Sequence, residues 1–114
     1  MTIIVVIMVR RQPYSLVYAR AGKENLRAIE AKFYSLIRDT IEEQLSFEPE
    51  VESRNRKPMR RPVEFGATWE LRFGPGNRFR VFYDTDQERH EVHVLAIGTK
   101  DRDRLIIGGE EFEI

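Results

Sequence analysis

The order of apolar and polar residues changes several times along the chain, and each change predicts an element. From Ile3 to Val9 every residue except Met8 is β-branched. Such a run is typical of a strand that is buried on both faces or covered by a partner. Residues 14–18 predict a second short strand. Residues 1–13 are therefore expected to form either a hairpin with that strand or an amino-terminal extension outside the core.

A different period begins at Lys23, where apolar residues recur at steps of three and four. They are Leu26, Ile29, Phe33, Leu36, Ile37, Ile41 and Leu45. This spacing predicts one apolar stripe on a helix. The stripe is long for a globular helix, and neither proline nor glycine interrupts it before Pro49. The pattern is compatible with one helix or with two helices in a tight hairpin.

Three later segments, 68–73, 78–83 and 91–97, are predicted to be strands. The first two alternate apolar and polar residues, and the third is apolar enough to be central, with Gly98 expected to end it. Residues 101–104 are expected to make one helical turn. Together with the helical stripe, these strands predict an α+β fold with an antiparallel or mixed sheet of about four strands.

The hairpin formed by the first two of these strands has a predictable register. With 75–77 as its loop, apolar residues face one another in three pairs: Phe73 with Phe79, Leu71 with Val81, and Trp69 with Tyr83. The opposite face then holds Arg72 directly across from Arg80, with Glu70 beside Phe82. Facing arginines repel unless a carboxylate, solvent or a bound anion compensates. A phosphate is the natural anion, because guanidinium donors match its oxygens in pairs.

Composition narrows the chemistry further. The 114 residues suit one domain, and the absence of cysteine excludes a disulfide or a cysteine metal site. We expect no metal and no cofactor. The net charge is zero, but the stretch from Arg54 to Arg80 holds eight basic and two acidic residues. Such a local patch favours polyanion binding. The segment 54–62, basic and punctuated by proline, is expected to be a loop.

The apolar run at the amino terminus is too short to span a bilayer, which needs about 20 residues. It also lacks the basic leader and the small-residue cleavage site of a secretory signal. No targeting signal is visible. We therefore expect a cytoplasmic protein without a membrane span.

Several segments together resemble the RelE/ParE family of small bacterial toxins. They are Trp-Glu-Leu-Arg-Phe at 69–73, Arg-Phe-Arg-Val-Phe-Tyr at 78–83, and Val-Leu-Ala-Ile-Gly-Thr-Lys at 94–100. Upstream, 14–18 and the helical stripe resemble the first strand and helical hairpin of the family. The resemblance covers roughly residues 14–100. It implies a β-α-α-β-β-β toxin domain over 14–114, with the stripe broken near residues 30–32.

The resemblance also implies a function: the toxin of a type II toxin–antitoxin system that cleaves messenger RNA on the ribosome. Its implied catalytic residues are Arg72, Arg80, Lys100 and Glu70, with Glu70 as a base on a ribose 2′-hydroxyl. Other basic residues are expected to contact the RNA backbone. They are Arg54, Arg56, Lys57, Arg60, Arg61 and Arg78. A cognate antitoxin is the expected protein partner.

Two alternatives follow from departures within the same family pattern. Where RelE has a carboxy-terminal tyrosine, this chain has Ile106 or its neighbours, and Glu70 replaces a basic residue. These departures favour a ParE-like toxin that binds DNA gyrase without catalysis. An inactive relative that binds only a partner is the third hypothesis.

Overall fold

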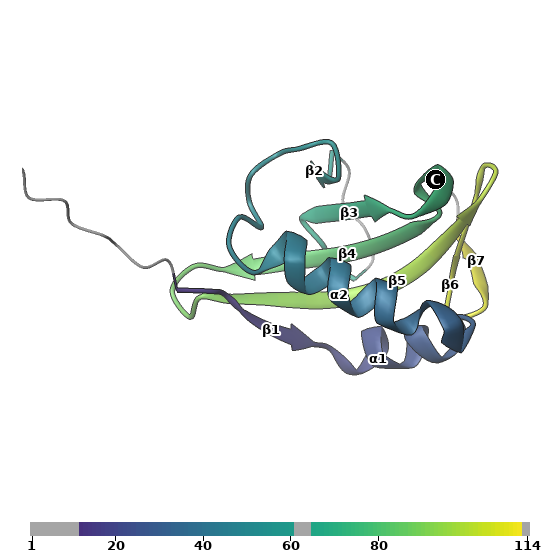
Figure 1. Ribbon diagram of the computed structural model, residues 1–114, viewed down its shortest axis with the longest axis horizontal. Coiled ribbons are helices and arrows are strands. Elements are labelled where there is room, and N and C mark those ends of the chain that lie inside the picture. Colours follow the sequence, from purple (N-terminus) through teal and green to yellow (C-terminus); the bar gives the residue numbers. More distant parts are fainter. Residues whose placement is uncertain (1–11, 61–64, 113–114) are drawn as a thin grey trace, which may run out of the picture.

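The computed structural model describes residues 12–60 and 65–112, which form one sheet with helices against one face (Figure 1). The helical elements are α1 (Arg20–Arg27), a 3₁₀ turn (Ala31–Phe33), α2 (Tyr34–Leu45) and a second 3₁₀ turn (Pro75–Asn77). The strands are β1 (Ser15–Tyr18), β2 (Arg56–Pro58), β3 (Trp69–Phe73), β4 (Phe79–Asp86), β5 (Glu91–Asp101), β6 (Arg104–Ile107) and β7 (Glu110–Phe112). No helix within these two ranges is long and apolar enough to cross a membrane.

The α+β class is confirmed, but the sheet is larger than predicted. Seven strands occur among the described residues, in the order β2-β3-β4-β5-β6-β7, with β1 also paired to β5. The pairs are antiparallel except for β1 with β5, which is parallel. The expected count of about four was low because short strands such as β2 and β7 have too few residues to show an alternating pattern.

Strand β5 is central, as predicted, and its outer edge is divided between two partners. Strand β1 pairs with residues 91–94, and β6 pairs with 98–101. Between them the Asn25 side chain of α1 accepts a hydrogen bond from the Ile97 backbone N–H at 3.1 Å. Helix α1 thereby satisfies a donor that no strand reaches.

The helical stripe forms two helices, which confirms the hairpin and excludes the single helix. Helix α1 ends at Arg27, and Glu30 has extended backbone angles, φ −56° and ψ 132°, before the 3₁₀ turn that leads into α2. The break lies close to the expected residues 30–32. Its residues have no unusual helix propensity, so tertiary docking on β5 decides where α1 ends.

Two predictions at the end of β5 are wrong. The strand does not stop at Gly98 but continues to Asp101. A Cβ atom on Gly98 would lie 2.7 Å from the Ile106 carbonyl oxygen and 2.8 Å from Ile107 Cγ1, so glycine permits the close approach of β6. Residues 101–104 form the turn of the β5–β6 hairpin and not a helical turn, with Arg102 in the left-handed region at φ 58°.

The basic segment 54–62 also differs from the prediction, since three of its residues form β2 and pair with β3. The predicted amino-terminal strand at residues 3–9 lies outside the described residues. The expected strand at 14–18 is confirmed as β1.

The main core lies between the helices and the sheet. It contains Ile37, Ile41 and Leu45 of α2 against the inward-facing residues of β3, β4 and β5, all of them buried. At its edge the Tyr83 side chain is fully buried, and its hydroxyl donates to the Pro49 carbonyl oxygen at 2.6 Å. Burial raises the pKa of Tyr83 well above that of a free tyrosine.

Replacing Tyr83 with phenylalanine tests this contact. At neutral pH we expect Tyr83→Phe to lower the free energy of unfolding by about 1–2 kcal/mol, because a buried carbonyl loses its donor. Wild-type stability is expected to fall as pH rises above about 10, where Tyr83 ionises in the unfolded chain but stays protonated in the folded one. The variant loses this component of the alkaline decline.

Urea unfolding at several pH values, with Tyr34→Phe as the matched control, measures both effects. Tyr34 is half-buried at the start of α2. If the stability of Tyr83→Phe falls at alkaline pH as steeply as that of the wild type, the assignment of this decline to Tyr83 is wrong.

Candidate functional site

The polar face of the β3–β4 hairpin has the register that the sequence predicts. Trp69 pairs with Tyr83, Leu71 with Val81, Arg72 with Arg80, and Phe73 with Phe79. The apolar members of these pairs belong to the core beneath the helices. Because side chains alternate along a strand, Glu70, Arg72 and Arg80 lie on the face that the helices do not cover.

One carboxylate oxygen joins the two arginines. Glu70 Oε1 accepts a hydrogen bond from Arg80 Nη1 at 2.6 Å and a second, short bond from Arg72 Nε. Arg80 Nε also donates to the Asn77 carbonyl oxygen at 3.0 Å. We call Glu70, Arg72 and Arg80 the arginine cluster. It shows how the facing arginines are tolerated: the protein supplies the compensating anion itself.

Burial differs sharply within the arginine cluster. The side chains of Arg80 and Glu70 are 8% and 11% exposed, whereas that of Arg72 is 39% exposed. Beside them, on the same face, Phe82, Ala96 and Ile107 form a small apolar cluster. Arg80 and Glu70 therefore form a nearly buried ion pair, and Arg72 carries the charge that meets solvent.

Two lysines extend the cationic surface around the arginine cluster. Lys57 of β2 lies directly across from Glu70, so both side chains project from the same face. Gly98 lies across from Arg80, and Lys100 follows two residues later on the same face of β5. The sheet therefore brings Glu70, Arg72 and Arg80 into contact and places Lys100 farther along the same face.

The other predicted RNA-contacting residues are distributed differently. Arg54 and Arg60 are exposed, and Arg61 lies outside the described residues. The Arg78 guanidinium lies 5.1 Å from the ring centre of Phe33 and 5.5 Å from that of Phe79. This cation–π stacking places Arg78 at the edge of the helix-side core, away from Arg80.

Arg56 is committed to the protein itself. Its Nε donates to the Val51 carbonyl oxygen at 2.8 Å, and its Nη1 donates to the Gln44 carbonyl and side-chain oxygens at 3.0 and 2.8 Å. Its side chain is 12% exposed and also lies 3.8 Å from Glu48. These bonds tie β2 to the end of α2, a structural role that its place in a basic segment does not reveal.

Alanine substitution tests whether Arg56 stabilises the fold while its exposed neighbour Arg54 does not. We expect Arg56→Ala to lower the free energy of unfolding by about 2–4 kcal/mol, because several oxygens lose a charged donor. The matched variant Arg54→Ala should change it by less than about 0.5 kcal/mol. Urea denaturation measures both changes, and equal losses of stability in the two variants would refute the structural role of Arg56.

Two asparagines that were not predicted as site residues also hold the arginine cluster in place. The Asn77 carbonyl accepts a hydrogen bond from Arg80, and Asn77 has a left-handed φ of 54°. Asparagine is typical of turns because it tolerates this conformation, so its place after 74–76 is a turn signal in the sequence. Asn55 Nδ2 donates to the Arg72 carbonyl at 2.8 Å, and the Arg72 N–H donates to the Asn55 carbonyl at the same distance. Nothing in the sequence around Asn55 marks this role.

The two histidines have local partners. The ring of His90 stacks on that of Tyr14 with 3.8 Å between centres, and its Nε2 lies 2.8 Å from the Gln12 carbonyl oxygen. His93 lies 3.3 Å from a Glu91 carboxylate oxygen. Within 12–60 and 65–112, no group of three or more potential ligands could hold a metal ion.

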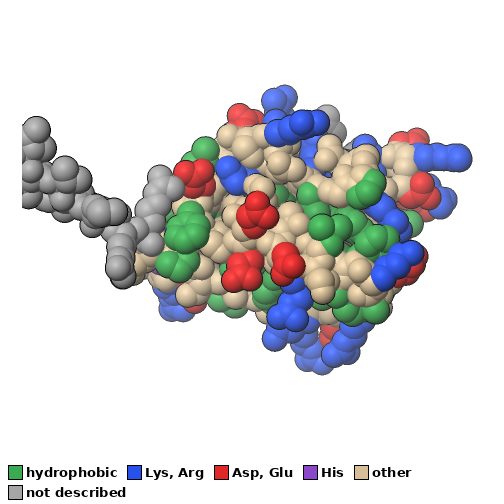
Figure 2. Space-filling view, viewed as in Figure 1, with side chains coloured by type: hydrophobic (Ala, Val, Ile, Leu, Met, Phe, Trp, Pro, Cys, Tyr) green, Lys and Arg blue, Asp and Glu red, His purple; other side chains and the backbone are tan. Residues whose placement is uncertain are grey.

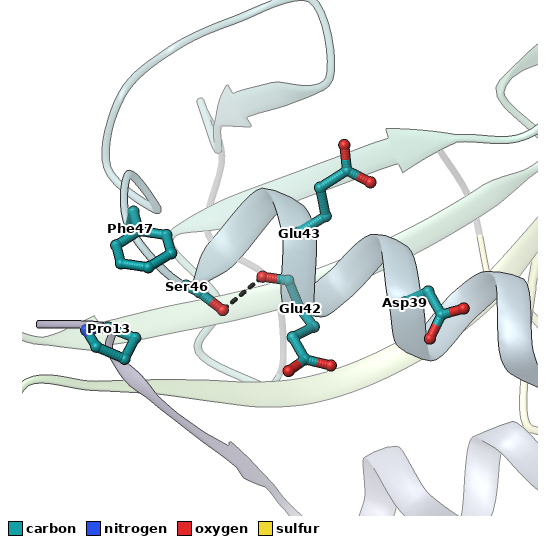
Figure 3. Close-up of a pocket in the computed structure, with 6 residues that line it drawn as sticks. All are labelled: Pro13, Asp39, Glu42, Glu43, Ser46 and Phe47. Carbon is teal, nitrogen blue, oxygen red and sulfur yellow. Dashed lines mark hydrogen bonds between the residues drawn. The ribbon is translucent and has the colours of Figure 1, made fainter. Parts of the chain in front are cut away.

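The helix side of the molecule carries an acidic patch on α2. Figure 2 shows acidic side chains gathered in the middle of this face, over α2. A shallow cavity of about 530 Å³ lies beside them, lined by Pro13, Asp39, Glu42, Glu43, Ser46 and Phe47 (Figure 3). Its carboxylates would repel a phosphate backbone, so a polyanion is favoured on the sheet face that carries the arginine cluster.

The arrangement of two helices on one sheet face, with basic residues on the other, is the RelE-like α+β fold that the sequence predicts. No protein-family model and no curated protein matches the chain. Among solved structures, it is similar to a chain of the crystal structure of the toxin–antitoxin complex RelBE2 from Mycobacterium tuberculosis. The two are 24% identical with a TM-score of 0.64, and the match covers 80% of this chain and 95% of that chain. The likeness shows a shared fold.

Proposed function

We propose that this protein is the toxin of a bacterial type II toxin–antitoxin system and that it cleaves messenger RNA. The observation that supports it is the arginine cluster, two facing arginines on the sheet face that the helices do not cover. The fold shared with a chain of a toxin–antitoxin complex supports the toxin role. A cytoplasmic location and a cognate antitoxin partner belong to the same proposal, as does the ribosome as the place where messenger RNA is presented.

The proposed reaction is an internal transesterification. The ribose 2′-oxygen attacks the adjacent phosphorus, a bond forms between them, and the bond from phosphorus to the 5′-oxygen breaks. The departing 5′-oxygen takes a proton from water and leaves as a hydroxyl. Negative charge builds on the non-bridging oxygens, which Arg72 and Arg80 are suited to stabilise. Lys100 would hold the neighbouring phosphate, and Glu70 would receive the 2′-hydroxyl proton once it is released from the arginines.

The RNA backbone would follow cations on the sheet face and its edge. Lys57 lies across from Glu70, and Arg54 and Arg60 are exposed on the segments that flank β2. Arg56 is left out of this proposed path because its guanidinium donates to carbonyl oxygens within the protein, whereas the exposed Arg78 stays a proposed RNA contact. Cations that contact successive phosphates make binding salt-dependent.

A second candidate function, gyrase binding without catalysis, is favoured by one feature of the arginine cluster. Glu70 neutralises one of the two arginine charges and keeps Arg80 nearly buried. A cluster with so little free charge is compatible with a surface that contacts protein. Inhibition of DNA supercoiling by the purified protein would support this function, whereas expression without growth arrest would support an inactive relative.

Controlled expression in a bacterial host tests the nuclease proposal. We expect the wild-type protein to arrest growth, and Arg72→Ala to slow RNA cleavage by about 100-fold or more, because one charge-stabilising donor is lost. Primer extension on a reporter transcript measures the cleavage. Arg72 is partly exposed, so its truncation should leave the fold intact.

The matched control is Arg38→Ala, which removes an exposed arginine from α2 on the other side of the sheet. It should cleave and arrest growth like the wild type. Undiminished cleavage by Arg72→Ala would refute the proposed site. Growth arrest with intact transcripts and inhibited gyrase would replace the nuclease with the second candidate.

A further inference from the structure

We propose that Glu70 occupies the place of a substrate phosphate in the arginine cluster, so that the free protein holds an internal anion which RNA must displace. The inference rests on the proposed function in taking RNA as the ligand. It adds a regulatory role for Glu70 at the same site. The binding experiment below depends on neither toxicity nor cleavage.

The first support is the hydrogen-bond geometry. A single oxygen, Glu70 Oε1, accepts bonds from Arg80 Nη1 at 2.6 Å and from Arg72 Nε. Carboxylate and phosphate oxygens accept charge-assisted hydrogen bonds from the same guanidinium donors, so a phosphate can bind the N–H groups that Glu70 occupies here. The carboxylate therefore fills the position that a phosphate would take.

The second support is the difference in burial between Arg72 and Arg80. It indicates the route by which a phosphate could replace Glu70. Arg72 is 39% exposed, whereas Arg80 is 8% exposed and is also held by the Asn77 carbonyl. An arriving phosphate therefore meets Arg72 first. It takes the Arg72 Nε donor from Glu70, while Arg80 stays in place as the fixed part of the site.

The third support is the charge balance. With Glu70 in place, two arginines and one carboxylate leave a single net positive charge. When Glu70 leaves the arginines, both face the phosphate, with Lys57 on the neighbouring strand. An internal anion competes with every external one, so it lowers affinity for loose RNA and favours a phosphate that is already held in position.

The test compares binding of a short, fluorescently labelled single-stranded RNA whose 2′-hydroxyls are methylated, so that no cleavage occurs. We expect Glu70→Gln to bind about tenfold more tightly than wild type in fluorescence anisotropy, because the competing charge is lost. The slope of log affinity against log salt should steepen by about 0.7, the equivalent of one added phosphate contact.

The matched control is Glu88→Gln, which makes the same change in net charge at an exposed turn distant from the arginine cluster in sequence. It should bind like the wild type. Equal affinity of Glu70→Gln and wild type, or an equal gain in Glu88→Gln, would overturn the inference.

A second variant covers the case in which Glu70→Gln does not fold, as judged by circular dichroism. Glu70→Asp keeps the charge but is one methylene shorter, so it should not bridge both arginines. Tighter RNA binding by this variant than by wild type supports the inference, and unchanged or weaker binding overturns it.

The two proposals fail separately. A wild-type protein that neither arrests growth nor cleaves RNA would defeat the proposed function, yet the affinity comparison would still decide the role of Glu70. Toxic protein whose Glu70 variants gain no affinity would defeat this inference alone.

Discussion

The shared carboxylate of Glu70 is the interaction on which the polar face of the sheet depends. The apolar pairs of β3 and β4 fix a register that places Arg72 across from Arg80. A slip of one residue would relieve that repulsion but would turn the apolar residues of one strand, such as Val81 of β4, away from the core. The register is therefore kept by burial on one face, and the resulting charge conflict is resolved on the other by Glu70.

This dependence explains why the arginine cluster is both structural and suited to chemistry. Arg80 is nearly buried and needs a charged partner, because an unpaired buried charge is strongly destabilising. The partner that satisfies this need is also the group that an anionic ligand would have to replace. Meanwhile acidic side chains gather over α2 on the helix side of the molecule (Figure 2). A polyanion and a protein partner can accordingly use separate surfaces.

Much of this arrangement could be predicted because it follows from local periodicity. The β3–β4 register needs only the alternation of apolar residues and the turn at 75–77. The break after Arg27 could not be located by pattern, since the contact that positions α1 joins Asn25 to Ile97, far away in sequence. Gly98 was misjudged for a similar reason. Its role is to admit β6, and a glycine that ends a strand looks the same in sequence.

The candidate site, too, could be predicted only in part. Alternation placed Glu70, Arg72 and Arg80 on one face, but it could not show that a single oxygen joins them. Composition placed Arg56 in a basic patch, although its guanidinium binds carbonyls at the end of α2. Charge counts reveal where cations are concentrated, whereas only the folded chain shows which of them are already paired.

Displacement of Glu70 by a phosphate can be observed in an NMR titration with single-stranded RNA that follows arginine Nε–H signals and the Glu70 carboxyl carbon together. We expect the Arg72 and Arg80 signals and the Glu70 carbon to change at the same RNA concentration, as a phosphate replaces the carboxylate. Changes confined to Arg54 and Arg60, with the arginine cluster unaffected, would contradict it.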